Sequence, residues 1–131
     1  MEKYVLLGTV LLLLLGTGCQ EIQLNNGERV VNEHGSIKNI NALNTFVSNV
    51  KDQKKAKINV ISYGIEGQKL FEKITFNGDY LNVHRSVDKN FIEEYQCEGI
   101  FVEENELEKR YILKQCTGDF TGEMELLTLK K

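Results

Sequence analysis

The chain contains 131 residues, with 16 basic and 19 acidic side chains, and it carries a formal net charge of −3 at pH 7. This length fits one globular domain. The mildly acidic balance argues against a nucleic-acid-binding protein, because such proteins concentrate positive charge on one surface.

The beginning of the chain predicts export. Lys3 precedes an apolar run at residues 4–15, and the small residues at positions 16–18 end at Cys19. This order is typical of a secretory signal peptide, and the apolar run is shorter than the roughly 17 to 25 residues that a membrane-spanning helix needs. The junction resembles the lipobox of bacterial lipoproteins, in which the first mature cysteine receives a diacylglycerol group. The resemblance implies that Cys19 ties the protein to the outer face of the cytoplasmic membrane.

The same junction leaves alternatives open. Gly16 stands where lipoproteins prefer a branched aliphatic residue, and Gly16 and Gly18 also suit an ordinary signal peptidase, which would release a soluble secreted protein. An uncleaved anchor is a further alternative. We interpret residues 1–18 as a lipoprotein signal peptide, residues 19–28 as a polar tether and residues 29–131 as a single globular domain.

One amphipathic helix is predicted after a short extended segment and a turn at His34 and Gly35. Apolar side chains recur at intervals of three and four residues, which places them on one helical face: Ile40, Leu43, Phe46, Val47 and Val50. Asn39 or Asn41 can cap the start of this helix.

From residue 56 onward the apolar pattern changes to a period of two, which predicts consecutive strands. We expect strands at residues 56–65, 70–76, 80–85, 96–103, 110–116 and 124–129. The Asn77-Gly78 pair favours a two-residue hairpin turn, because both positions tolerate a positive φ. Such a turn would place Ile74 opposite Leu81.

The last predicted hairpin has a register in which the numbers of paired residues sum to 213. This register pairs Phe101 with Ile112 and places Cys97 opposite Cys116. Facing positions that are not hydrogen-bonded to each other lie within disulfide reach, and a disulfide persists outside the cytoplasm. We therefore predict a Cys97–Cys116 disulfide, with Cys19 reserved for lipid. The alternative is two small buried residues. Two thiols alone do not make a tetrahedral metal site, so no metal is expected.

Several short segments carry a family resemblance: VVNEHG at 30–35, NINAL at 39–43, KINV at 57–60, YGIEG at 63–67 and SVD at 86–88, together with the cysteine pair. They resemble a family of small lipoproteins of Gram-positive bacilli that is recorded only as a domain of unknown function. The likeness covers roughly residues 29–116, and the chain departs from the family pattern at residues 68–69 and 88–90. The resemblance implies export and anchoring and brings no known activity.

Three polar residues are candidate binding residues: His34 in the first turn, Asp88 in a polar break between strands and Asp119 in a turn-rich segment near the end. No spacing pairs His34 with an acid for general acid–base catalysis. The sequence also lacks a phosphate-binding loop and a calcium-binding loop. It therefore identifies no catalytic residue and no cofactor.

These patterns predict an α+β fold, in which one amphipathic helix packs on an antiparallel sheet of about six strands in a cystatin-like wrap. The alternative is a small barrel plugged by the helix. The expected function is a non-catalytic binding or interaction module at the cell surface, which recognises a peptide, a wall polymer or a partner protein. The alternative is a hydrolase or metal-dependent enzyme of the cell envelope that uses His34 with acidic residues.

Overall fold

The computed structural model describes residues 28–131. The predicted signal peptide, the lipidation site Cys19 and most of the tether lie outside these residues. Within the described part of the chain, the helical segment lacks the length and apolar character that a membrane crossing requires.

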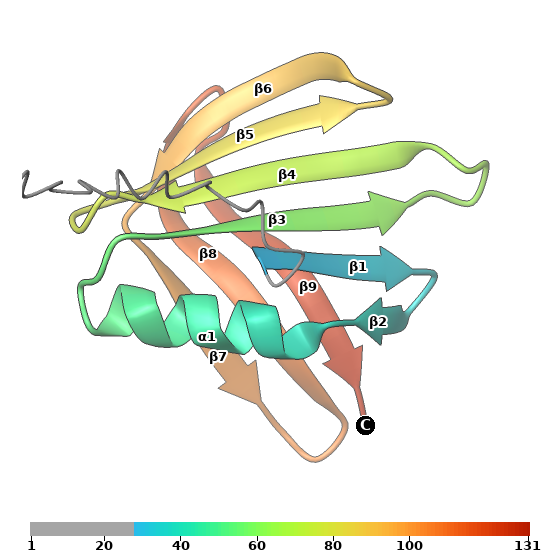
Figure 1. Cartoon of the computed structure of the whole chain (residues 1–131), viewed down its shortest axis with the longest axis horizontal. Helices are drawn as coiled ribbons and strands as arrows, with labels where there is room; N and C mark the ends of the chain where they lie inside the picture. Colours follow the sequence, from blue (N-terminus) through green and yellow to red (C-terminus); the bar gives the residue numbers. More distant parts are fainter. Residues whose placement is uncertain (1–27) are drawn as a thin grey trace, which may run out of the picture.

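The described chain folds into strands and one short helix (Figure 1). In chain order the elements are β1 (Arg29–Glu33), β2 (Ser36–Lys38), α1 (Ile40–Lys51), β3 (Ala56–Tyr63), β4 (Lys69–Phe76), β5 (Leu81–Val87), β6 (Asn90–Cys97), β7 (Gly99–Glu104), β8 (Glu108–Gly118) and β9 (Gly122–Lys130).

The strands form one strongly curled sheet with the order β2-β1-β3-β4-β5-β6-β8-β7, and β9 also pairs with β8. Neighbouring strands are antiparallel except β1 and β3, which run parallel from the Arg29–Asn59 pair to the Glu33–Tyr63 pair. The β8 strand pairs with β7 and β9 along most of its length and with β6 only at its end. This double role bends the sheet into a nearly closed, barrel-like wall.

The predicted α+β fold, one helix on about six antiparallel strands, is therefore wrong. The described chain is mostly strand, with nine strands and a helix of 12 residues. The prediction missed β2, which has only 3 residues, and it assigned no element to residues 91–95, which make up most of β6. It also joined the end of β6 to β7 as one strand, whereas the structure has two strands that are separated at Glu98.

A glycine permits the contact that bends the sheet. Gly118 ends β8 with a φ of +126°, which side-chain-bearing residues rarely adopt. A Cβ atom at this position would lie 3.1 Å from Tyr95 Cα and 3.2 Å from the Glu94 carbonyl oxygen. The absence of a side chain at Gly118 therefore lets the end of β8 lie directly against β6.

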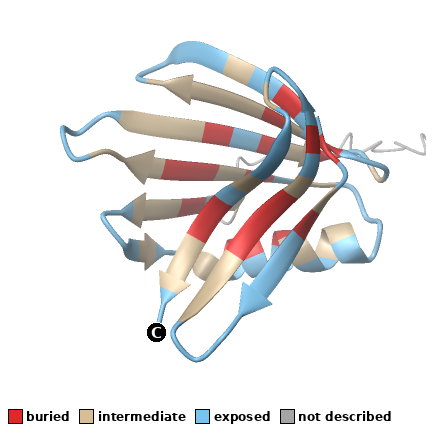
Figure 2. Cartoon of the chain, turned by 180° about the vertical axis from the view of Figure 1, so that it is seen from behind, coloured by how far each residue is buried: buried red, intermediate tan, exposed pale blue. Residues whose placement is uncertain are grey.

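The hydrophobic core lies inside the curled sheet and beneath the helix. Figure 2 shows buried segments in the middle of the strands, and the strand ends are more exposed. The helix contacts β1 and β3 on one side and β7 on the other, so it fills the side that the strands leave open. Leu43 and Phe46 are almost completely buried there, and each contributes roughly 1.5 to 3 kcal/mol through burial.

The β4–β5 turn differs from the expected two-residue hairpin. The Asn77 side chain accepts hydrogen bonds from the backbone N–H groups of Asp79 and Tyr80, at 2.9 Å each. The turn therefore includes Tyr80, and Leu81 pairs with Phe76 instead of Ile74. Asparagine favours such side-chain turns because its carbonyl oxygen replaces a backbone acceptor.

Candidate functional site

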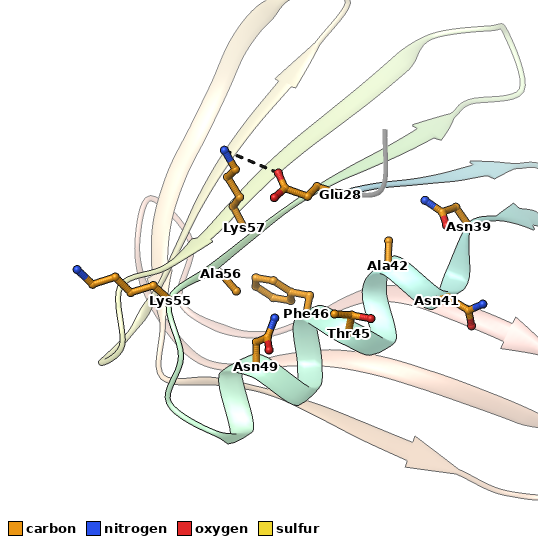
Figure 3. A pocket seen from close by; sticks show the side chains of 10 residues that line it. All are labelled: Glu28, Asn39, Asn41, Ala42, Thr45, Phe46, Asn49, Lys55, Ala56 and Lys57. Atoms are coloured by element: carbon orange, nitrogen blue, oxygen red, sulfur yellow. Dashed lines mark ion pairs between the residues drawn. The ribbon is translucent and has the colours of Figure 1, made fainter. Parts of the chain in front are cut away.

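A polar groove of about 390 Å³ runs between α1 and the first residues of β3 (Figure 3). We call it the amide groove, because the helical wall and helix start carry three asparagines. Its lining consists of Glu28, Asn39, Asn41, Ala42, Thr45, Phe46, Asn49, Lys55, Ala56 and Lys57.

The helical wall of the amide groove follows from residue spacing along α1. Asn41, Thr45 and Asn49 recur every four residues, so they lie on one side of the helix. The start of the helix is fixed by Asn39, whose backbone is left-handed with a φ of 63°. Its side chain does not cap the helix as predicted; it donates a hydrogen bond of 2.7 Å to the Arg29 carbonyl oxygen. This bond ties the start of the helix to β1.

The floor of the groove is apolar and its open end is basic. Phe46 and Ala56 lie side by side between the helix and β3, as Figure 3 shows. Lys57 points towards Glu28, with 3.7 Å between Nζ and Oε2, and Lys55 extends away from the helix. Two ammonium groups and one carboxylate therefore line the groove, which leaves an excess of one positive charge.

The chemistry of these side chains suits binding. Each asparagine amide offers two donors and an acceptor, and the threonine hydroxyl can donate and accept. Such groups match a ligand that presents both amide or hydroxyl donors and carbonyl acceptors. A hydroxyl nucleophile needs an adjacent base, and none of the residues lining the groove is a histidine.

A second groove lies on the other side of α1, between the helix and β7. It has a volume of about 520 Å³ and is lined by Val47, Val50, Lys51 and the first four residues of β7, Gly99, Ile100, Phe101 and Val102. Apart from Lys51 the walls are apolar. The helix thus separates an amide groove on its β3 side from an apolar groove on its β7 side.

His34 occupies the turn between β1 and β2 and is exposed. Its backbone has a φ of 52°, and the turn is held by the Asn32 side chain, which accepts a hydrogen bond of 2.9 Å from the Gly35 N–H. The neighbouring Glu33 forms an ion pair of 3.6 Å with Lys38. His34 is not among the residues that line the amide groove.

Asp88 and Asp119 hold turns against neighbouring strands by the same pair of hydrogen bonds, one through the side chain and one through the backbone. Asp88 Oδ1 accepts a hydrogen bond of 2.9 Å from the Lys69 N–H, while the Asp88 N–H donates to the Lys69 carbonyl oxygen, also at 2.9 Å. Asp119 Oδ2 accepts from the Glu94 N–H at 3.0 Å, and the Asp119 N–H donates to the Glu94 carbonyl oxygen at 3.2 Å. Both carboxylates therefore have structural partners.

The three predicted binding residues lie on three different turns: β1–β2, β5–β6 and β8–β9. Asp88 also lines a hollow of about 400 Å³ together with Lys69, Phe71, Ser86 and Lys89. Within residues 28–131, no group of three or more histidine, cysteine, aspartate or glutamate side chains is arranged to hold a metal ion.

Cys97 at the end of β6 and Cys116 in β8 form the predicted disulfide bond, and both residues are buried. The predicted register of the β7–β8 hairpin is confirmed, because Phe101 pairs with Ile112 and Val102 with Tyr111. The bond joins the two strands close to the point where β8 reaches β6. It is part of the core and lies apart from the amide groove.

A partly buried charged cluster spans β4, β5 and β6. Glu72 is only 4% exposed, and its Oε2 lies 3.4 Å from Arg85 Nε in an ion pair that lacks hydrogen-bond geometry. Arg85 also pairs with Glu93. Burial raises the pKa of Glu72 to about 7, and Arg85 only partly opposes this rise. Burial likewise raises the pKa of Tyr95, whose hydroxyl has no hydrogen-bond partner within residues 28–131.

The residues of the amide groove were not identified from the sequence. The sequence predicts the apolar face of α1, but it indicates a role only for Asn39 or Asn41, as a helix cap. Asparagine is a poor helix former, so four of them between residues 39 and 49 are a signal that helix stability alone does not explain. The sequence does not indicate the β3 wall. This wall forms where β1 leaves the start of β3 uncovered, and β1 pairs with β3 only from Asn59 onward.

The comparisons with known proteins give a family. The family model described as a domain of unknown function (DUF4362) matches residues 27–112, a segment that contains both walls of the amide groove. No curated protein and no solved structure matches the chain. Because the matched segment covers more than half of the chain, the resemblance to a family recorded as a domain of unknown function is confirmed, and the protein belongs to the DUF4362 family.

Proposed function

We propose that this protein is a non-catalytic binding module, held at the outer face of the cytoplasmic membrane by a diacylglycerol group on Cys19, which takes its ligand in the amide groove. The observation that carries the proposal is the groove itself. Asn41, Thr45 and Asn49 line up along one wall above the apolar floor, with the basic groups of Lys55 and Lys57 at the open end.

The groove suits a binding function in size and in chemistry. Small-ligand sites are concave, have volumes of roughly 300 to 1,000 Å³ and combine apolar surface with a few polar groups. The amide groove has about 390 Å³, an apolar floor around Phe46 and a polar rim. Its polar groups can bind and orient a ligand, and its lining lacks a hydroxyl–histidine pair of the kind that acyl transfer uses.

The membrane attachment has its support in the sequence. The apolar run at residues 4–15 and the small residues before Cys19 resemble those of an exported lipoprotein. The test is the intact mass of the protein extracted from membranes. Cleavage before Cys19 with an added diacylglycerol is expected, whereas recovery of the uncleaved chain, or of a cleaved chain without lipid, would remove the anchor from the proposal.

The binding role is tested with two matched variants of α1. Asn49→Trp fills the amide groove, and Ser48→Trp places the same side chain on the exposed face of the helix, outside both grooves. The full chain in detergent is tested against a displayed library of seven-residue peptides, purified peptidoglycan and wall teichoic acid. Binding that Ser48→Trp keeps and Asn49→Trp loses supports the proposal. Binding that both variants keep, or no binding to any probe, overturns it.

A further inference from the structure

The open edge of β3 borders the amide groove. β4 pairs with β3 along its whole length, beginning with Ala56 opposite Phe76. β1 covers the other edge only from Asn59 onward, because its first residue, Arg29, pairs with Asn59. Within residues 28–131, the segment 56–58 therefore has a strand partner on one side only.

An unpaired strand edge presents backbone N–H and C=O groups at alternate residues, and a further strand can bind to them. The segment 56–58 is about 10 Å long at the 3.3 Å rise of a strand residue. Ala56 and Lys57 line the amide groove, so the start of β3 borders this open space. The groove thus offers a place for an extended chain beside β3.

The opposite wall complements this edge. An extended peptide that pairs with β3 has a second edge, with its own N–H and C=O groups, and that edge would face α1. Thr45 and Asn49 lie there, with side chains that donate and accept hydrogen bonds. A peptide between β3 and α1 can therefore satisfy backbone groups on both of its edges.

The charge of the groove selects among peptides. Lys55 and Lys57 bring two positive charges, and Glu28 pairs with Lys57 at 3.7 Å, which leaves one positive charge in excess. An acidic side chain or a terminal carboxylate of the ligand would balance that charge.

We infer that the ligand of the amide groove is an extended acidic peptide, which adds to the open edge of β3 as a further strand and is clamped from the other side by the amides of α1. This inference rests on the proposed binding function and specifies its ligand class. A glycan would use the same amides, but it lacks the alternating backbone groups that a strand edge pairs with.

The experiment uses peptides selected from the displayed library and resynthesised with backbone N-methyl groups. N-methylation removes one N–H donor and leaves the side chains in place. In an added strand only every second N–H faces β3, and the others face α1. Two series are made, one methylated at odd positions and one at even positions, and Kd values for the full chain are measured by calorimetry.

The expected result is alternation. Methylation of residues that face β3 raises Kd at least 10-fold, because it removes a hydrogen bond and places a methyl group against the strand. Methylation that faces the more adaptable side chains of α1 has a smaller effect. Peptide binding also slows hydrogen exchange of backbone amides within residues 56–58. Replacing the acidic residue of the peptide by its amide weakens binding, and added salt reduces that difference.

The outcomes separate this inference from the proposed function. If Asn49→Trp abolishes binding but both methylated series bind as tightly as the parent peptide, the strand addition is overturned and the groove remains the binding site. The same holds if only peptidoglycan or teichoic acid binds in a way that Asn49→Trp blocks. If the selected peptides bind equally well to Asn49→Trp and to the wild type, both proposals fail.

Discussion

Glu72 and Arg85 face each other across β4 and β5 inside the curled sheet, with 3.4 Å between Glu72 Oε2 and Arg85 Nε. Glu93 lies opposite Arg85 on β6, so one guanidinium stands between two carboxylates in a row across three strands. The Glu72 carboxyl is the deeper of the two, and its pKa is raised by burial in spite of the neighbouring cation.

This pairing predicts a pH-dependent stability. Glu72 has an ordinary pKa of 4.5 and a pKa of about 7 in the folded protein, so the folded state holds the proton more tightly. The stability that Glu72 contributes is therefore fully present below pH 4.5 and is lost as the pH rises to 7 and above. The loss amounts to about 3 kcal/mol. The glutamine of Glu72→Gln does not titrate, so this variant lacks the pH-dependent loss of stability. Its unfolding free energy should therefore rise relative to that of the wild type as the pH increases from 4.5 to above 7.

Urea denaturation at several pH values between 4.5 and 8 measures this effect. Glu106→Gln, in the exposed β7–β8 turn, is the matched control and should follow the wild-type curve. Parallel pH profiles for Glu72→Gln and the wild type would contradict the prediction.

The disulfide predicts a second change in stability. The cysteines are 19 residues apart, and a crosslink of this span restricts the unfolded chain by about 3 kcal/mol. Replacing both Cys97 and Cys116 by alanine should lower the unfolding free energy by that amount. A reducing agent should destabilise the wild type in the same direction and leave the double variant unchanged. Equal sensitivity of both proteins to the reducing agent would show that the bond is not the cause.

Asp119→Ala should lower the unfolding free energy of the protein without affecting peptide binding in the amide groove. The change removes the acceptor for the Glu94 N–H and leaves the β8–β9 turn tied to β6 only through backbone hydrogen bonds. Loss of one such hydrogen bond costs about 1 to 3 kcal/mol. Faster hydrogen exchange at Glu94 together with unchanged peptide binding is the expected result, and Asp119→Asn, which keeps a side-chain oxygen, should retain most of the stability. A loss of peptide binding in the folded Asp119→Ala protein would instead restore Asp119 as a binding residue.

Tyr111→Phe should weaken the attachment of α1 to β8. The Tyr111 hydroxyl donates a hydrogen bond from β8 to the Asn44 side chain on α1. Its removal should lower the unfolding free energy by about 1 kcal/mol, and the double variant with Asn44→Ala should cost less than the sum of the two single changes. Denaturation of the four proteins gives this coupling. Strict additivity would mean that the contact contributes nothing.

Local features of the fold could be predicted from the sequence. The apolar spacing of α1 identifies Leu43 and Phe46 as core residues, and both are buried. The β7–β8 register follows from complementary pairs such as Phe101 with Ile112, because a two-stranded hairpin is fixed by residues close in the chain. The family resemblance depends on short segments and was confirmed over much of the chain.

Long-range features could not be predicted in this way. The parallel pairing of β1 with β3 joins segments that are separated by the whole helix, and no local pattern indicates it. The closure of the sheet depends on the short pairing of β6 with β8, Tyr95 with Gly118 and Gln96 with Thr117, which joins segments more than 20 residues apart. The β4–β5 register was wrong because the Asn77 side chain, not its backbone conformation alone, determines the turn.

The ion pair between Glu28 and Lys57 places the first described residue of the domain at the rim of the amide groove. If Cys19 carries the proposed lipid, the ten residues at positions 19–28 can span at most about 35 Å. The proposed attachment would then keep the groove within about that distance of the bilayer, because Glu28 lines the groove. A captured peptide would accordingly be kept close to the lipid headgroups.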